Sequence, residues 1–140
     1  MKETLFWDTN VVLDLLGERD PFYISAARIA SLADNNKITI VVSALTFSTV
    51  FYVLSKFESK DCVKEKLRKF KIIVKITDLS EKVIEKALAS KFTDFEDALQ
   101  YFCAEEYGCD ILITRDAKDF KNSSIPILSP NEYLSSLELE

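Results

Sequence analysis

Acidic residues recur in this chain at places where they could act together on a metal ion. Asp8 ends an apolar run near the start of the chain, and Asp116 directly follows another apolar run near its end. Asp94 and Asp97 are three residues apart, a spacing that places both side chains on one face of a helix. Carboxylates gathered in a cleft repel one another, and a hard divalent cation such as Mg²⁺ relieves that repulsion. The pattern therefore predicts a divalent-metal site, provided that the fold brings the three segments together.

The chemistry that suits such a site is hydrolysis of a phosphodiester bond. A bound divalent metal can activate water, stabilise charge on a phosphate oxygen and orient the leaving group. The sequence contains no histidine, which excludes Ser-His-Asp and Cys-His catalysis and any histidine acid–base chemistry. The three cysteines, Cys62, Cys103 and Cys109, are an odd number without the spacing of a zinc site, so we expect buried free thiols.

Each acid also has an ordinary structural explanation. Asp8 and Asp94 both stand where an aspartate could cap the N-terminus of a helix. Asp97 in a first helical turn would interact favourably with the helix dipole, and Asp119 fits a solvated turn. The metal hypothesis therefore depends on the joint position of these residues rather than on any one of them.

The elements that must position these acids alternate between apolar strands and amphipathic helices. The predicted strands are residues 4–7, 38–42, 72–76, 111–114 and 125–128. Predicted helices cover residues 10–16, 21–33, 44–54 and 60–70, then a segment capped by Asp78 or Ser80 and reaching Leu88, a segment opened by Thr93 or Asp94 and reaching Tyr107, and the segment from Pro130 onward. Asp20 is expected to cap the second helix, with Pro21 at its first position.

Fully apolar strands that alternate with helices indicate a parallel sheet covered on both faces, here in a single α/β domain spanning residues 1–140. In such sheets, sites form beyond the carboxyl ends of the strands. Asp8 and Asp116 each follow a predicted strand, and Asp94 and Asp97 open the helix before the fourth strand. We therefore expect all four carboxylates at one edge of the sheet.

The net charge of −5 is unevenly distributed along the chain. Residues 56–75 carry eight Lys or Arg against three acids, whereas residues 76–140 carry six against fourteen. The basic run fits either a solvated helix face or a contact with a polyanion. The longest apolar runs are too short to cross a bilayer, and polar residues 8–10 interrupt the place of a signal peptide. We expect a cytoplasmic protein without a membrane partner.

Taken together, these segments resemble the PIN-domain family over nearly the whole chain. The segments that carry the resemblance are residues 6–14 (FWDTNVVLD), 92–100 (FTDFEDALQ), 111–116 (ILITRD) and the final pair Asp119-Phe120. Their order and spacing both agree with the family pattern. The resemblance implies a three-layer α/β/α sandwich with a central parallel sheet.

The resemblance also implies an activity and a set of site residues. Proteins of this kind are Mg²⁺- or Mn²⁺-dependent ribonucleases, and many are toxins silenced by a small antitoxin protein and commonly form homodimers. By match to the motifs, Asp8, Asp97 and Asp116 would hold the metal, with Asp94 close by. The residues expected to support these ligands are Asn10, Thr114 and Asp119, and those expected to contact RNA are Arg115, Lys118 and Lys121.

One position departs from the family pattern. Many PIN domains carry a glutamate on the helix after the second strand, where this chain has Thr49. This departure motivates a second hypothesis, in which a PIN fold with impaired catalysis acts as a binding module for a protein or RNA. A phosphatase or phospho-receiver is disfavoured, because Asn10 stands where the former needs a second acid and the first strand ends without an acidic pair.

Overall fold

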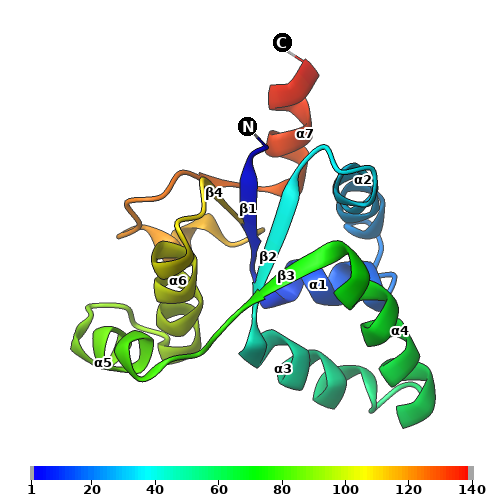
Figure 1. Cartoon of the computed structure of the whole chain (residues 1–140), viewed down its shortest axis with the longest axis horizontal. Coiled ribbons are helices and arrows are strands. Elements are labelled where there is room, and N and C mark those ends of the chain that lie inside the picture. Colours follow the sequence, from blue (N-terminus) through cyan, green and yellow to red (C-terminus); the bar gives the residue numbers. More distant parts are fainter. Residues whose placement is uncertain (1, 139–140) are drawn as a thin grey trace.

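Five parallel strands form one sheet in the order β3-β2-β1-β4-β5 in the computed structural model, which describes residues 2–138 (Figure 1). The strands are β1 (Thr4–Trp7), β2 (Thr39–Ser43), β3 (Val74–Thr77), β4 (Ile111–Ile113) and β5 (Ile127–Leu128). In the central strand, Phe6 pairs with Val41 of β2 on one side and with Leu112 of β4 on the other. The predicted α/β class and parallel sheet are confirmed.

Alternate residues of the central strands face two separate hydrophobic cores, which explains why β1 is apolar throughout. Leu5 and Trp7 belong to one core, and Phe6 belongs to the other with Leu112. The first core is covered by α1 (Thr9–Leu16), α2 (Tyr23–Asp34), α3 (Ala44–Leu54), α4 (Lys60–Ile73) and α7 (Pro130–Glu138). The second is covered by α5 (Glu81–Ala89), α6 (Phe95–Tyr107) and the 3₁₀ helix η1 (Ala117–Phe120). The three layers are visible in Figure 1, where α5 and α6 lie on the opposite side of the sheet from α1 to α4.

Several helix ends follow from local chemistry that the sequence displays. The Ser43 hydroxyl accepts a hydrogen bond from Leu45 N at the start of α3, and the Ser80 hydroxyl caps α5 through Val83 N. Gly108 ends α6 with a φ of 84°, a left-handed conformation that glycine adopts without steric cost. The predicted starts of these helices and the end of α6 are therefore confirmed.

The predicted starts of three elements are wrong, among them that of the fifth strand, which begins at Ile127 instead of residue 125. The second helix begins at Tyr23 rather than Pro21, and Asp20 does not cap it. Residues 17–22 instead connect α1 to α2, and the ring of Phe22 packs against the guanidinium of Arg115, which follows β4. The strand predicted at residues 72–76 begins at Val74, because α4 continues to Ile73 and packs Phe70 and Ile73 on the first core.

Two further predictions concern cysteines and membranes. Cys103 and Cys109 are buried free thiols as expected, but Cys62 is exposed, because the α4 residues that face the core are Val63 and Phe70. Within residues 2–138, no helix combines the length and apolar character needed for a bilayer crossing.

Candidate functional site

Asp8 lies at the junction of β1 and α1, at the carboxyl edge of the sheet. Its backbone extends the strand through a 3.0 Å hydrogen bond to Ile113 O, and the Thr114 hydroxyl donates to Asp8 Oδ2 at 3.0 Å. Burial raises the pKa of Asp8 to about 6, and the charge of Asp116 adds to this effect while the Thr114 hydrogen bond opposes it. No lysine or arginine of the described residues forms an ion pair with this buried carboxylate.

Asp94 and Asp97 open α6, as the sequence predicts. Asp94 is the N-cap, and its Oδ1 accepts a hydrogen bond of 3.0 Å from Asp97 N. This contact confirms that Asp94 caps the N-terminus of α6, and it also fixes the first turn of the helix. Asp97 is half-buried, and burial raises its pKa to about 7, with further contributions from the charges of Asp94, Asp8 and Asp119.

Acids from separate segments lie at one edge of the sheet, where Thr114 after β4 is hydrogen-bonded to Asp8 after β1 and to Asp116 N. The Asp8 carboxyl senses Asp116 from beyond β4, and the Asp97 carboxyl senses both Asp8 and Asp119. Glu96 also contributes to both raised pKa values, although none of the sequence motifs singles it out. Neighbouring residues on a helix usually point in different directions, but side chains in a first turn can all reach past the helix end. The position of Glu96 in the first turn of the predicted helix, next to Asp97, was the only feature of the sequence that could have suggested its role.

The remaining residues expected to support the acids have different surroundings. Thr114 links two of the acids, because its hydroxyl donates to Asp8 and accepts from Asp116 N at 3.1 Å. Asp119 N donates to Asp116 O at 2.9 Å at the start of η1, where Asp116 is the N-cap. Asn10 is half-buried in α1, and its amide makes no hydrogen bond to any residue in the described range 2–138.

Lysines line one side of the acidic edge. A hollow of about 110 Å³ lies between two segments, the loop that leads into α6 and η1 with the turn after it, and both segments contribute acids and lysines to its lining. Its lining comprises Lys91, Phe92, Thr93, Asp94, Asp97, Lys118, Asp119, Lys121 and Asn122. Lys118 and Lys121 are two of the predicted RNA contacts, whereas Lys91 was missed because only the folded loop brings it to the site. Cations stand beside the carboxylates without forming ion pairs with them in residues 2–138.

A family model described as PIN domain matches residues 4–118. The chain belongs to the PIN-domain family. Among curated relatives, it is 29% identical over 136 residues to Ribonuclease VapC1 of Aquifex aeolicus (strain VF5), covering 94% of this chain and 93% of that protein.

Solved structures share the fold at lower identity. VapBC-1 from nontypeable Haemophilus influenzae matches with a TM-score of 0.70 and 17% identity, over 91% of this chain and 98% of that chain. A toxin-antitoxin complex from Klebsiella pneumoniae matches with a TM-score of 0.67 and 23% identity, over 90% of this chain and 97% of that chain. The expected three-layer PIN fold is confirmed.

The acids of this PIN domain are hard oxygen donors, the kind of ligand that suits a divalent cation, although they do not form a closed cage. Within residues 2–138, no three acidic or cysteine side chains are arranged closely enough to enclose a metal ion. Mg²⁺ is commonly held by one or two carboxylates and keeps several waters, so an open site of hard oxygen donors is suitable. Thr49, at the position where many PIN domains have glutamate, is half-buried on α3 and supplies no carboxylate.

Arg115 has a different position from the one expected of an RNA contact. Its Nε donates to Asp14 Oδ2 at 2.7 Å and a terminal nitrogen donates to Asp14 Oδ1 at 3.2 Å. The guanidinium also lies 3.7 Å from the ring centroid of Phe22. Because Asp14 is only 1% exposed, this two-point ion pair engages the charge of Arg115 within the PIN domain.

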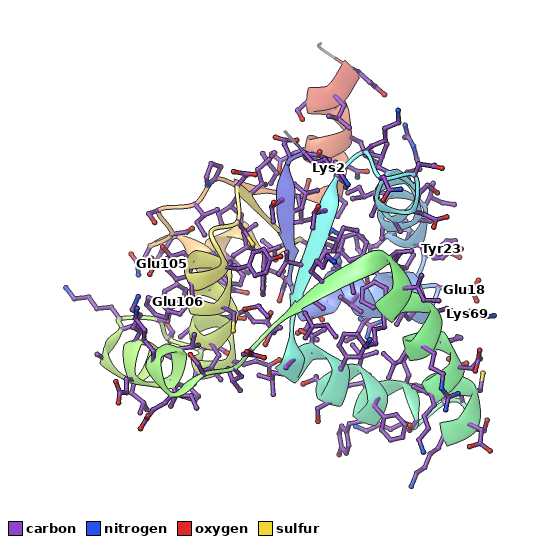
Figure 2. The ribbon with its side chains drawn as sticks, viewed as in Figure 1. Lys2, Glu18, Tyr23, Lys69, Glu105 and Glu106 are labelled. Atoms are coloured by element: carbon purple, nitrogen blue, oxygen red, sulfur yellow. The ribbon has the colours of Figure 1, made fainter. Side chains whose placement is uncertain are left out.

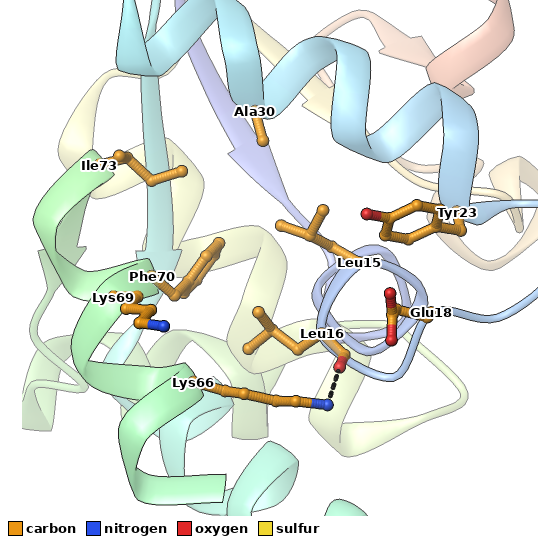
Figure 3. A pocket seen from close by; sticks show the side chains of 9 residues that line it. All are labelled: Leu15, Leu16, Glu18, Tyr23, Ala30, Lys66, Lys69, Phe70 and Ile73. Atoms are coloured by element: carbon orange, nitrogen blue, oxygen red, sulfur yellow. Dashed lines mark hydrogen bonds between the residues drawn. The ribbon is translucent and has the colours of Figure 1, made fainter. Parts of the chain in front are cut away.

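A second hollow of the PIN domain, a groove, lies away from the acids. It has a volume of about 520 Å³ and is formed by α1, the turn that follows it, α2 and α4 (Figure 3). The lining residues are Leu15, Leu16, Glu18, Tyr23, Ala30, Lys66, Lys69, Phe70 and Ile73. Lys66 Nζ donates to Leu16 O at 2.9 Å, as the dashed line in Figure 3 marks. Figure 2 shows Glu18, Tyr23 and Lys69 of this groove on the opposite side of the sheet from Glu105 and Glu106 of α6. The groove has an apolar floor with lysines along one wall. This lining suits the binding of a polypeptide segment and does not resemble the acidic edge.

Proposed function

We propose that this chain is a divalent-metal-dependent endoribonuclease that hydrolyses RNA phosphodiester bonds at Asp8, Asp97 and Asp116. The observation that carries the proposal is the Thr114 hydroxyl, which donates to Asp8 Oδ2 and accepts from Asp116 N, so that it joins the two strand-end acids. Asp97 lies close enough to Asp8 for the two charges to interact, and the pKa values of Asp97 and Asp8 are raised to about 7 and about 6. Carboxylates held in this way disfavour their own ionised state, and a bound divalent cation reverses that preference. The PIN fold and the relative named as a ribonuclease support the same substrate.

In this proposal, Asp8, Asp97 and Asp116 hold Mg²⁺ or Mn²⁺, with Asp94 nearby. When bound, the metal lowers the pKa of a water and stabilises charge on the scissile phosphate. The Thr114 hydroxyl orients Asp8 Oδ2, and the Asp116 N–H in turn orients that hydroxyl. Lys91, Lys118 and Lys121 bind the phosphates on either side of the cut.

We further propose that the chain is the toxin of a toxin–antitoxin pair and acts in the cytoplasm. Its structural relatives include a complex named as a toxin–antitoxin pair and several named VapBC. The groove between α1, α2 and α4 offers apolar contacts through Leu15, Leu16 and Phe70, with Lys66 and Lys69 beside them. An antitoxin segment with apolar and acidic residues fits this lining. Self-association into a homodimer belongs to the same proposal.

The test is cleavage of a labelled single-stranded RNA with Mg²⁺, Mn²⁺ or EDTA. Asp8→Ala is compared with Glu85→Gln, which also removes one negative charge but lies exposed on α5 and makes no ion pair in the described chain. We expect cleavage that requires metal, disappears in Asp8→Ala and persists in Glu85→Gln. Equal cleavage by all three proteins would assign the activity to a contaminant and reject the proposed site.

Two observations favour a second candidate, a PIN fold that binds a partner without cutting RNA. Thr49 leaves the site one carboxylate short of the usual family set, and the acids form no closed cage within residues 2–138. This candidate is supported if folded protein cleaves no RNA at any Mn²⁺ concentration yet still binds RNA or a partner protein after the Asp8→Ala change.

A further inference from the structure

A buried hydrogen-bond network lies among the elements that carry the site. Gln100 Nε2 donates to Thr9 Oγ1 at 2.6 Å and to Thr46 Oγ1 at 3.3 Å, and the two hydroxyls are 3.0 Å apart. The three side chains are 1%, 6% and 0% exposed, respectively. They come from α6, α1 and α3, so the network joins three helices that are distant in the sequence.

Each end of this network is one short step from a proposed metal ligand. Thr9 directly follows Asp8, and Gln100 is three residues after Asp97, on the next turn of α6. The network therefore ties the backbone that carries Asp8 to the helix that carries Asp97. Thr46 on α3 is the third anchor, three residues before Thr49, the position where the family glutamate is missing.

Stability alone does not account for this network. Gln100 Oε1 is buried and accepts no hydrogen bond from the described part of the chain, and an unsatisfied buried acceptor carries a desolvation cost. Apolar side chains of similar shape would fill the same space without that cost. What an apolar core would not supply is a directional tie, because hydrogen bonds fix distance and orientation while apolar contacts tolerate sliding.

We propose that Gln100 and Thr46 are positioning residues that hold Asp8 and Asp97 at the separation required for one divalent cation. This inference rests on the proposed metal-dependent function. Neither residue touches the cation or the RNA. They act through Thr9 and through the first turns of α6.

The test uses two substitutions of one buried residue. Thr46→Val keeps the shape of the side chain and removes its hydroxyl, whereas Thr46→Ser keeps the hydroxyl and removes a methyl group. We expect Mn²⁺ affinity, measured by calorimetry on the full chain without RNA, to fall about 10-fold in Thr46→Val, the lower end of what supporting hydrogen bonds contribute. Thr46→Ser should bind Mn²⁺ like the native chain even if its melting temperature is lower.

Gln100→Met provides the second arm, with Tyr101→Phe as its control on the same helix. Tyr101 is also buried and hydrogen-bonded, but to Glu105 and Ser124, away from the acids. We expect Gln100→Met to weaken Mn²⁺ binding and to lower kcat without raising KM for RNA, and Tyr101→Phe to leave both unchanged.

The possible outcomes separate the inference from the function on which it rests. Native Mn²⁺ affinity in both Thr46→Val and Gln100→Met would overturn the positioning role while leaving the nuclease intact. Weaker binding in Thr46→Ser than in Thr46→Val would show that packing, and not the hydroxyl, matters. No Mn²⁺ binding by the native chain would instead reject the proposed function itself.

Discussion

At the scale of single residues, the carboxyls of Asp8 and Asp97 share one property that ordinary surface acids lack. Burial and neighbouring acids raise their pKa values to about 6 and about 7, so both take up protons near neutral pH in the absence of metal. A divalent cation favours the ionised forms and must displace those protons. Binding of metal to this site is therefore expected to weaken as the pH falls from about 8 towards 5.

The same shift makes stability depend on pH in a defined direction. Because the folded pKa of Asp8 is above its ordinary value of 3.8, the folded state binds more protons than the unfolded state between about pH 4 and pH 6. The stability associated with the protonated carboxyl is present below pH 4 and is lost as the pH rises through 6. In EDTA, the free energy of unfolding of the native protein should fall by about 2–2.5 kcal/mol more than that of Asp8→Asn between pH 4 and pH 8.

Urea unfolding of the two proteins at several pH values measures this difference. Asp8→Asn retains an oxygen that can accept the Thr114 hydrogen bond, so it isolates the effect of charge. If the free energy of unfolding changed with pH equally in the two proteins, the pKa of Asp8 would not be raised by burial.

Glu96 gives a second prediction at the residue scale. Its charge raises the pKa values of both Asp8 and Asp97, so Glu96→Gln should lower both. The pH below which Mn²⁺ binding is lost should therefore fall by a fraction of a unit, because solvent partly screens the charge of Glu96 from the two aspartates. Glu85→Gln on α5 is the control, and the same displacement in that variant would indicate a general charge effect.

At the scale of elements, Arg115 joins β4 to α1 through Asp14. Removal of the guanidinium takes away its two hydrogen bonds to the buried Asp14 carboxylate. The longer ion pair of Asp14 with Arg19, at 3.8 Å, remains. Arg115→Ala should therefore lower the free energy of unfolding by about 1.5–3 kcal/mol, the cost of lost hydrogen bonds to a charged group. Arg68→Ala removes an exposed pair with Glu65 and should cost less than about 1 kcal/mol.

Chemical denaturation of both variants tests this assignment. A small effect for Arg115→Ala, together with weaker RNA binding, would restore Arg115 to the role of RNA contact that the sequence predicts. A large drop in stability with an unchanged salt dependence of RNA binding supports the structural role.

How far the sequence determines these elements depends on where each signal originates. The Asp94 cap, the Gly108 end of α6 and the apolar run of β1 are local, and each was predictable from a few neighbouring residues. The start of α2 was not, because the contact between Phe22 and Arg115 joins segments far apart in the sequence. The local pattern also predicted that Asp8 follows a strand and that Asp97 lies in the first turn of a helix.

Lys91 and Gln100 illustrate what the sequence could not indicate about the site. Lys91 reaches the acidic hollow only through the path of the loop before α6. Gln100 looks like an ordinary polar residue until the fold places two threonines beside it. Both depend on contacts between helices that no local pattern encodes.

At the scale of the whole molecule, a net charge of −5 disfavours binding of RNA except where cations are concentrated. Lys91, Lys118 and Lys121 provide that concentration beside the acids. Replacement of all three by Gln should raise KM for RNA. It should also reduce the salt dependence of binding by about 0.7 for each phosphate that the lysines no longer neutralise.

The control is Lys37→Gln, an exposed lysine in the turn before β2, at the amino end of the parallel strands. RNA titrations at several salt concentrations distinguish the variants. An equal change in slope for Lys37→Gln would mean that RNA senses the overall charge of the molecule instead of the lysines at the hollow.

The short helix α1 connects the two proposed binding regions of the molecule. Asp8 immediately precedes its first residue, and Leu15 and Leu16 at its end line the large groove. Its 8 residues span about 12 Å at 1.5 Å per residue. A polypeptide anchored in the groove would thus hold its flanking residues at an effective concentration in the millimolar range beside the carboxylates. A side chain with little affinity of its own for the acidic edge would still occupy it while the anchor stayed bound, and would leave it as soon as the anchor dissociated.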